Sequence, residues 1–357
     1  MKNKKIIIPI AITALCAALH LAFVLSESFS DLFNTTVAAA IRTVLAKITG
    51  IFVFSFAEFF LYSIPVIIIF IAIVANKQGG KIAPKLIFVG QFAIWTLVGV
   101  YALFVLTFAS GYNGSPLNEK LNIERKNVSA DELYETLVYV TEKTNEAAQN
   151  ISFNEDGSSS IPYGYSELSS KISDAYKHVY KEKELGYTFC SRVKTIAMSP
   201  LMTYTHISGV YSFFTGEANI NTNYPGYVCA FSAAHEMAHQ RGISKEDEAN
   251  FTAYLICIES DDDYLRYSGY LSMFNYLATA LRSADNELYS LAVSRLCDEA
   301  KGELYAYSVF FDKYRDNTAA KVSDAVNDTY LKAQGTQGVK SYGMVVDLTI
   351  AYHKIYK

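Results

Sequence analysis

Hydrophobic residues are spread unevenly along this chain, and three long apolar runs stand in its first third. They cover about residues 6–25, 51–75 and 86–110. A helix rises about 1.5 Å per residue, so each run is long enough to cross a hydrocarbon layer roughly 30 Å thick. We therefore expect a membrane domain of residues 1–110 with three transmembrane helices, whose partner is the lipid bilayer.

The first apolar run also fits a signal peptide, because lysines precede it at the N-terminus. No small-x-small cleavage site of the usual kind follows Ser26, and two further runs come after it. A retained transmembrane helix is therefore the better interpretation of residues 6–25.

The basic residues around these runs are distributed asymmetrically. Six precede the first run or separate the second from the third, against two in the segment between the first and second: Lys2, Lys4, Lys5, Lys77, Lys81 and Lys85 against Arg42 and Lys47. Basic residues concentrate on the cytoplasmic side of membrane proteins. The pattern predicts a multi-pass protein of the plasma membrane with a cytoplasmic N-terminus, and it places everything after about Gly111 outside the cytoplasm.

Two polar features of the membrane domain leave alternatives open. Residues 30–47 have apolar positions at helical spacing and fit either a helix along the outer interface or an ordinary loop helix. Glu58 is an intramembrane carboxylate, which is a functional candidate, but it lies close enough to the outer end of its run to reach water.

The chain after the membrane domain has a different, mainly helical pattern. Residues 111–128 are polar and turn-rich and predict a linker, and residues 129–357 predict a second domain. Ser129 and Glu132 have the spacing of a capping box, which opens a helix to about residue 150. Helices are also expected over about 167–183 and over much of 264–356.

One segment of the second domain breaks this helical pattern. Residues 207–227 combine glycines with β-branched and aromatic residues and predict a strand. An edge strand ahead of the next helix would pair with an extended peptide, and this makes Glu217 and Asn219, at its turn or rim, candidate substrate-binding residues. The fold class is therefore mainly α, with a small β edge.

Composition narrows the classes of function. The 357 residues hold 31 Lys and Arg against 35 Asp and Glu, a net charge of -4, so no nucleic-acid partner is expected. The 27 Tyr and 22 Phe are enough for a real core. No pair of the five cysteines has Cys-x-x-Cys spacing, and buried thiols are the preferred interpretation over disulfides.

The strongest chemical pattern is His235-Glu236-Met237-Ala238-His239. Histidines four residues apart project from one helix face and can bind one ion, which makes Zn²⁺ the expected cofactor. Glu236 lies about 100° round the helix, where its carboxylate can touch a metal-bound water. Because zinc lowers the pKa of such a water to about 7, Glu236 is the expected general base for hydrolysis of a peptide bond.

The same five-residue pattern also occurs on solvated surface helices, so its neighbours decide its meaning. Phe231, Ala233 and Ala234 make this helix apolar enough to be buried. Its two imidazoles and carboxylate then need partners inside the protein, and a metal ion would meet that need.

A third metal ligand is expected from the segment that follows. Gly242 ends the first helix, and Ser244 with Asp247 forms the N-cap signal of a second helix to about Glu259. Glu246 and Glu248 are the candidates, and at about 200° apart they cannot both face one ion.

We choose Glu246 as the ligand, because it shares a face with the small residues Ala249 and Ala253, which allow close packing on the first helix. Glu248 is the runner-up, and both acids could instead complement the helix N-terminus. Asn250, one turn after Glu246, could accept a hydrogen bond from the far nitrogen of a liganding histidine.

Three segments carry a resemblance: HEMAHQRGISKEDEANF, GVYSFFTGEANIN and YLKAQGTQGVKSYGMVVDL. They resemble the bacterial membrane-protein family catalogued as domain of unknown function 3810, over nearly the whole chain. The resemblance implies a zincin-like α+β fold and a bound metal, but no substrate. Glu246-x-x-Ala249-Asn250 is similar to the third-ligand helix of gluzincin peptidases. Tyr342 in the last segment would stabilise an oxyanion if that segment closes over the site, although it also fits a core position.

Together these features predict a membrane-anchored, zinc-dependent metallopeptidase with an extracytoplasmic catalytic domain, acting on a peptide or protein. The alternative is a non-enzymatic, zinc-stabilised membrane sensor or peptide-binding module. Water in the fourth zinc position would favour the enzyme, and a protein side chain there would favour the sensor.

Overall fold

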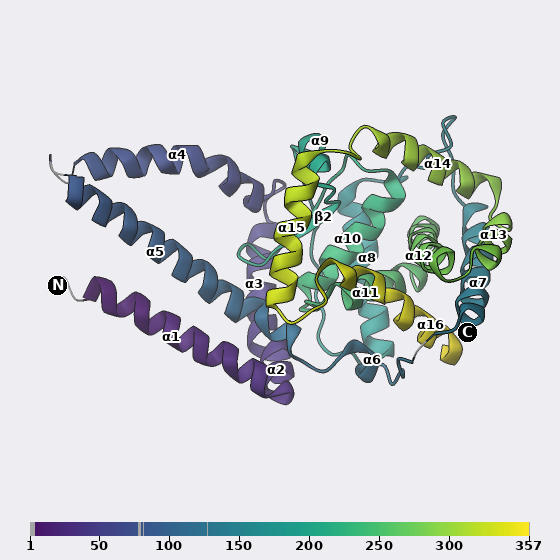
Figure 1. The fold of residues 1–357 in the computed structure, drawn as a ribbon, viewed down its shortest axis with the longest axis horizontal. Helices are drawn as coiled ribbons and strands as arrows, with labels where there is room; N and C mark the ends of the chain where they lie inside the picture. The colour runs from purple at the N-terminus through teal and green to yellow at the C-terminus, as the bar shows by residue number, and fades with distance from the viewer. Residues whose placement is uncertain (1–3, 78–79, 81, 127, 357) are drawn as a thin grey trace. The chain divides into compact units, whose positions relative to one another are not determined.

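The computed structural model describes residues 4–77, 80, 82–126 and 128–356. It is built mainly from helices, as predicted (Figure 1), and its described residues include a three-stranded sheet. Its contacts divide the chain into two units. The N-terminal unit comprises Met1–Gly114 and Ser212–Glu217, and the C-terminal unit comprises Ser115–Tyr211 and Ala218–Lys357.

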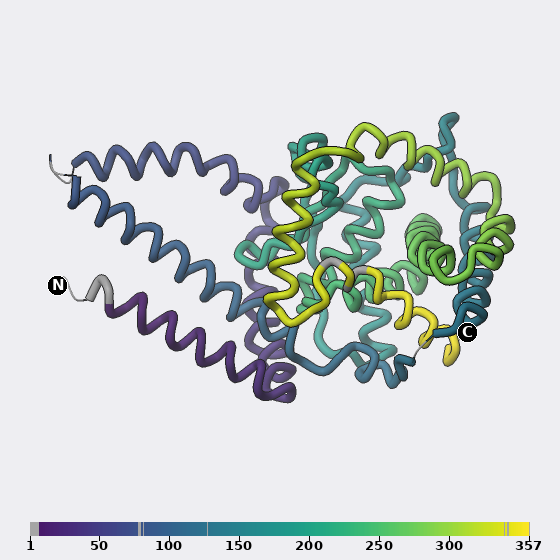
Figure 2. Tube along the Cα trace, in the orientation of Figure 1, coloured from purple at the N-terminus to yellow at the C-terminus, as the bar shows by residue number. Residues whose placement is uncertain are grey.

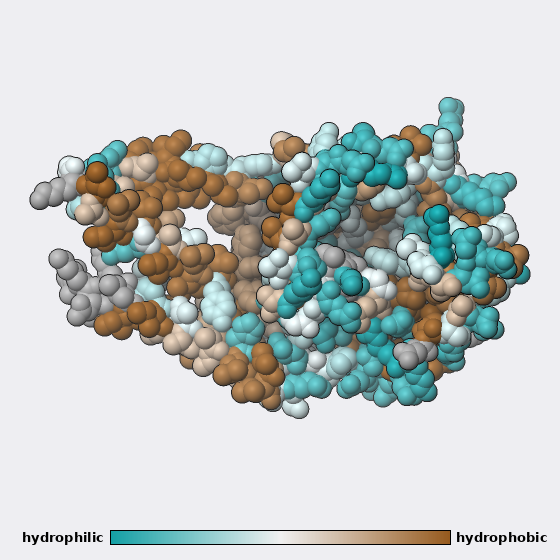
Figure 3. All heavy atoms as spheres, viewed as in Figure 1, coloured by the Kyte–Doolittle hydropathy of each residue, from teal (hydrophilic) through white to brown (hydrophobic). Residues whose placement is uncertain are grey.

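Three helices of the N-terminal unit are long and apolar enough to cross a membrane: α1 (Lys4–Leu25), α4 (Phe56–Asn76) and α5 (Ile82–Thr107). Their apolar side chains point outward, and these helices are largely brown in Figure 3. Apolar surface of this kind is stable in lipid and not in water. The prediction of three such helices is confirmed, although α4 begins later than residue 51 because the Ser55 hydroxyl caps it by accepting the Glu58 N–H.

The segment between the first two spans is helical. It consists of α2 (Glu27–Phe33), the π-helix η1 (Asn34–Ala38) and α3 (Ala39–Gly50). Arg42 on α3 is 1% exposed. Its guanidinium donates to the side-chain and backbone oxygens of Asn34 at 2.9 Å and to the carbonyl oxygen of Thr107 at 2.7 Å. The predicted helix over residues 30–47 is therefore present, and Arg42 ties it to the end of α5.

The short η2 (Ala109–Tyr112) follows α5 in the N-terminal unit. The helical elements of the C-terminal unit are α6 (Leu117–Lys120), α7 (Ala130–Ala148), α8 (Tyr165–Glu182), α9 (Ser199–Met202), η3 (Thr203–Thr205), α10 (Gly226–Gln240), α11 (Glu246–Ile258), α12 (Asp263–Ala284), α13 (Asn286–Ser294), α14 (Asp298–Asp312), α15 (Thr318–Ala333), η4 (Gly338–Met344) and α16 (Val345–Tyr356). Figure 2 shows α15 in yellow-green and α16 in yellow, near the end of the chain. The predicted capping box opens α7, where Ser129 and Glu132 bond each other's backbone N–H groups.

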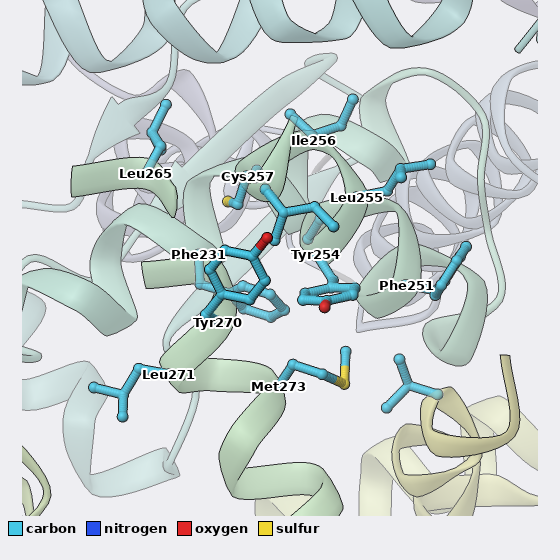
Figure 4. Packing of buried hydrophobic residues seen from close by; sticks show 14 of the residues in the cluster. Phe231, Phe251, Tyr254, Leu255, Ile256, Cys257, Leu265, Tyr270, Leu271 and Met273 are labelled. Atoms are coloured by element: carbon cyan, nitrogen blue, oxygen red, sulfur yellow. The ribbon is translucent and has the colours of Figure 1, made fainter. Parts of the chain in front are cut away.

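Helices α10, α11 and α12 pack together at the centre of the C-terminal unit. Phe231, Phe251, Tyr254 and Met273 are among the buried side chains between them (Figure 4). Truncating a core side chain of this size to Ala costs about 2–5 kcal/mol. This packing fixes α10 against α11, and so fixes the side chains that the two helices present to each other.

The cysteines contribute thiols and not crosslinks. Within the described residues all five are free, and Cys16, Cys229 and Cys257 are buried. The interpretation of the four cysteines after Cys16 as small buried thiols is therefore confirmed for Cys229 and Cys257, whereas Cys190 is exposed and Cys297 is partly exposed.

The sheet has the strand order β1-β3-β2, with β1 (Lys194–Thr195), β2 (Gly209–Ser212) and β3 (Glu217–Ile220). β1 pairs with β3 in parallel and was not predicted. The predicted strand over residues 207–227 is in fact two short strands joined by a tight turn, where Gly216 has a φ of 70°. β2 is an edge strand of this sheet, in the place that the sequence predicted.

Candidate metal centre

Helix α10 presents two histidines on one face. The ring centroids of His235 and His239 are 4.6 Å apart, with the rings nearly perpendicular. Both side chains are buried, at 9% and 5% exposure. The two histidines, four residues apart, therefore project from one face of the helix as predicted, and their imidazoles lie side by side inside the protein.

The turn after α10 brings the next helix back to the histidines. Gly242 has a φ of 96°, the left-handed conformation that ends a helix. The Ile243 N–H donates to the carbonyl oxygen of Ala238 at 3.2 Å, and the Gly242 N–H donates to that of His239 at 2.9 Å. This is a Schellman motif, and it confirms Gly242 as the end of the helix. The predicted cap at Ser244 is wrong by one residue, because Lys245 is the N-cap of α11.

Glu246, in the first turn of α11, lies between the two imidazoles. One carboxylate oxygen, Oε2, is 3.2 Å from Nε2 of His235 and 3.5 Å from Nε2 of His239. One ligand atom from each of the three residues lies within 4.8 Å of the others. These three residues, the trio below, form a group among the described residues that could hold a metal ion.

The charges of this cluster are strongly coupled. Burial would raise the pKa of Glu246, but the two imidazoles hold it well below its usual range. Burial would lower the pKa of His239, but the Glu246 carboxylate outweighs burial and raises this pKa to about 9. A buried carboxylate therefore requires a positive charge at this point, which either a proton or a metal cation can supply.

The hydrogen bond on the far side of His239 fixes its tautomer. Nδ1 lies 2.7 Å from the carbonyl oxygen of Ile243, which can only accept. Nδ1 therefore carries a proton in either charge state, so in the neutral ring the lone pair of Nε2 is left to bind an ion beside Glu246. The predicted support of a histidine by Asn250 is not found for His239, because the Schellman turn brings the Ile243 carbonyl there first.

Glu236 is buried at 5% exposure beside the trio. Burial raises its pKa, while the imidazoles and a hydrogen bond from the Tyr211 backbone N–H act in the opposite direction. Its second oxygen, Oε2, has no hydrogen-bond partner among the described residues, and neither has Nδ1 of His235. Buried polar atoms without partners are rare and mark places where a ligand or ion can bind.

Glu248, the runner-up for the third ligand, has a different environment. Its Oε1 accepts the backbone N–H of Leu117 at 3.1 Å and lies 3.5 Å from Nζ of Lys245. Glu248 therefore anchors the start of α6 and takes no part in the trio. The two acids lie on different faces of α11, as their spacing predicted.

A cleft of about 660 Å³ in the C-terminal unit opens onto α10, where His235, Glu236 and Asn250 line it. Its other walls carry hydroxyl and amide side chains: Ser208, Ser232, Ser272, Asn275, Thr279, Ser323 and Asn327. Among the described residues that line it there is no Lys or Arg. The cleft therefore offers many uncharged hydrogen-bonding groups beside the histidines.

Tyr276 of α12 lines this cleft and was not predicted. It interacts with the Asn250 side chain, and burial raises the pKa of Tyr276 to about 12, so that its phenol is protonated at neutral pH. Nothing in the local sequence distinguishes Tyr276 from the many other tyrosines. Only the packing of α12 on α11 brings it to Asn250.

The candidate substrate-binding residues Glu217 and Asn219 lie elsewhere. Glu217 is 1% exposed, and its carboxylate accepts the backbone N–H groups of Phe56 and Ala57 at 3.1 and 3.0 Å, which caps α4. The Asn219 side chain donates to the carbonyl oxygen of Val210 at 3.1 Å, across from β3 to β2. Neither residue lines the cleft.

Tyr342, the candidate oxyanion donor, belongs to η4, and its side chain lies outside the described part of the chain. His206 lines the cleft, and its Nε2 bonds the carbonyl oxygen of Tyr314 at 2.7 Å. This bond holds His206 against the end of α14. His178 is exposed on α8, beside Glu182, away from the trio.

Comparison with known protein families gives a match over residues 33–350, to the family described as "Protein of unknown function (DUF3810)". No curated protein and no solved structure matches the chain. The matched segment includes both helices of the trio and the strand ahead of them. Since the match covers far more than half of the residues, the chain belongs to the DUF3810 family.

Proposed function

We propose that this protein is a membrane-anchored zinc metallopeptidase. The spacing of the three ligand atoms carries this proposal. Glu246 Oε2 lies 3.2 and 3.5 Å from the two histidine Nε2 atoms. A tetrahedral zinc ion with bonds of about 2.1 Å separates its ligand atoms by about 3.4 Å, so one ion fits between them.

The donor set and its surroundings support zinc in particular. Two imidazoles and one carboxylate are a ligand set that zinc prefers, and three protein ligands leave one position open. The Ile243 carbonyl holds the proton of His239 on Nδ1, so Nε2 is ready to bind a metal. Glu236, which lines the cleft, has a buried oxygen, Oε2, with no hydrogen-bond partner in the described chain.

The chemistry follows from these positions. A zinc ion held by His235, His239 and Glu246 would polarise a peptide carbonyl and lower the pKa of a bound water to about 7. Glu236 takes a proton from the attacking water and passes it to the amine that leaves. Tyr276 lines the same cleft, and its protonated phenol donates a hydrogen bond to the developing oxyanion.

Hydroxyl and amide groups predominate among the polar side chains that line the cleft, beside the carboxylates of Glu236 and Asp324, and this supports a peptide as substrate. Serine, threonine and asparagine side chains can bond to peptide N–H and C=O groups without selecting a charge. No Lys or Arg is among the described residues that line the cleft, so none of them offers the bidentate or ammonium contact that commonly binds phosphate groups.

The test uses full-length protein purified in detergent, with metal analysis and a mixture of synthetic peptides as substrate. Wild-type protein is expected to hold one zinc ion and to cleave. Glu236→Gln should keep the zinc and lose cleavage, while Glu167→Gln, which changes an exposed carboxylate on α8, should behave as wild type. Undiminished cleavage by Glu236→Gln, or a wild type without metal, would refute the proposal. Zinc without any cleavage would favour the sensor.

We further propose that the C-terminal unit lies outside the cytoplasm, supported by the six basic residues against two around the spans. The exposed Cys190 provides a test. A membrane-impermeant thiol reagent should label it in intact cells, and Cys190→Ser should abolish that label. Labelling only after the cells are opened would reverse the orientation.

A further inference from the structure

The backbone of the edge strand β2 lies so close to the Glu236 side chain at Gly209 that a side chain at this position would not fit. A Cβ added to Gly209 would lie 2.6 Å from Oε1 and 2.7 Å from Cγ of Glu236. Contacts this short are not tolerated without displacement of one of the two groups. Gly209 is not among the glycines with positive φ in the described chain. Its backbone therefore suits any residue, and the space taken by Glu236 is what excludes a side chain.

A second residue of β2 contacts the same carboxylate. The backbone N–H of Tyr211 donates a hydrogen bond to Glu236. Gly209 and Tyr211 are two residues apart, so they share one face of the strand. The Tyr211 ring lies on this side as well, 6.5 Å from the His239 ring and nearly parallel to it. One face of β2 thus borders both the carboxylate and a histidine of the trio.

The strand itself is held in register with α10. The Ser232 hydroxyl, one turn before Glu236 on that helix, bonds the Ser208 hydroxyl at 2.8 Å. The Ser208 carbonyl oxygen accepts the backbone N–H of Asn221 at 2.9 Å, and the Val210 carbonyl oxygen accepts the Asn219 side chain at 3.1 Å. These bonds fix where Gly209 and Tyr211 meet Glu236.

We propose that Gly209 and the Tyr211 amide are positioning elements for Glu236, which set its carboxylate in the orientation used for proton transfer. Gly209 leaves the space that the side chain fills, and the amide binds the carboxylate of Glu236, which lines the cleft and whose Oε2 has no hydrogen-bond partner in the described chain. Displacing a catalytic group by about 1 Å can lower the rate by about 10²-fold. The inference rests on the proposed function, because it assigns Glu236 the role of general base.

The first test is Gly209→Ala in full-length, zinc-loaded protein. Its kcat should fall by about 10²-fold, with KM and zinc content close to those of the wild type, since the new methyl group moves only the base. Val210→Ala is the matched control, because Val210 is exposed on the other face of β2. It should keep the wild-type kcat. An unchanged kcat in Gly209→Ala would overturn the proposal.

The second test does not use activity. Gly209→Ala should lower the unfolding midpoint in the wild-type background, and this loss should disappear in a Glu236→Ala background, where every atom in short contact has been removed. Equal losses in both backgrounds would overturn the inference. If wild-type protein cleaves no peptide, the proposed function fails, while this cycle still reports whether β2 sets the Glu236 side chain.

Discussion

Both units bury charged side chains, but they satisfy them in different ways. Arg42 in the N-terminal unit is 1% exposed and donates three hydrogen bonds to oxygens of Asn34 and Thr107. Glu236 in the C-terminal unit is 5% exposed, yet its Oε2 has no hydrogen-bond partner in the described chain. The terminal nitrogens of Arg42 are bonded within the fold and tie α3 to the end of α5, whereas a buried carboxylate oxygen without a partner is available to a ligand. The hydrogen bonds that each side chain makes, and not its burial, therefore distinguish the structural role of Arg42 from the candidate functional role of Glu236.

The same contrast holds for apolar surface. The candidate spans of the N-terminal unit expose Ile68, Ile69 and Phe70 at 59%, 60% and 64%. The C-terminal unit turns residues of this kind inward, and Phe251 and Met273 are fully buried. One rule, that apolar groups leave water, accounts for both arrangements, because helices long and apolar enough to cross a membrane suit lipid, while the C-terminal unit buries such groups in its own interior.

The largest expected effect is that of the neutral substitution Glu246→Gln. It removes the negative charge that the trio offers to an ion, so we expect zinc content and peptide cleavage to fall to background. Glu248→Gln is the matched control on the same helix, because its side chain bonds Leu117 and not the histidines. It should keep its zinc. Metal analysis of both variants tests whether Glu246 is a zinc ligand, and equal zinc content in the two would show that it is not.

A smaller effect is expected from Tyr276→Phe, which deletes one hydroxyl from the cleft wall. Loss of one oxyanion donor lowers kcat by about 10²-fold or somewhat more, and KM and zinc content should change little. Tyr305→Phe is the control, since Tyr305 is 70% exposed on α14. Steady-state kinetics on one cleaved peptide would show whether kcat falls while KM stays unchanged. A wild-type kcat in Tyr276→Phe would show that a group other than the Tyr276 hydroxyl stabilises the oxyanion.

The smallest effect is expected in the N-terminal unit. Glu217→Ala removes the carboxylate that caps α4 at Phe56 and Ala57, which should cost about 1–2 kcal/mol of unfolding free energy in detergent. Zinc content should not change, because the lost bonds lie outside the trio. Glu58→Gln is the control at the same helix end, where the carboxylate accepts the Tyr62 hydroxyl, and it should cost less than about 0.5 kcal/mol. Loss of zinc in Glu217→Ala would show that the two units depend on each other.

The sequence allowed the local features to be predicted well. The three apolar helices, the Ser129–Glu132 capping box and the end of α10 at Gly242 all follow from spacing within one or two helical turns. The common face of His235 and His239 follows from the helical period in the same way. The separation of Glu246 from Glu248 also needed only the 100° step of a helix, which is about 200° for two residues.

The features that failed or were missed depend on packing. Asn250 was expected to support a histidine, but the carbonyl oxygen of Ile243 reaches His239 first. Glu217 was expected beside a substrate, but it caps a helix that begins far earlier in the chain. No local pattern reports which backbone group will lie nearest a side chain once two helices have packed.

The amino-acid sequence by itself determined where the helices run, which of them suit a membrane, and which residue types stand together on α10, because periodicity and capping act over a few residues. Glu246, chosen from the sequence, lies with the histidines, whereas tertiary structure alone decided that Tyr276 lines their cleft and that Gly209 lies against Glu236. These contacts join segments far apart in the chain. They form only when a shared core sets the distance between their helices and strands.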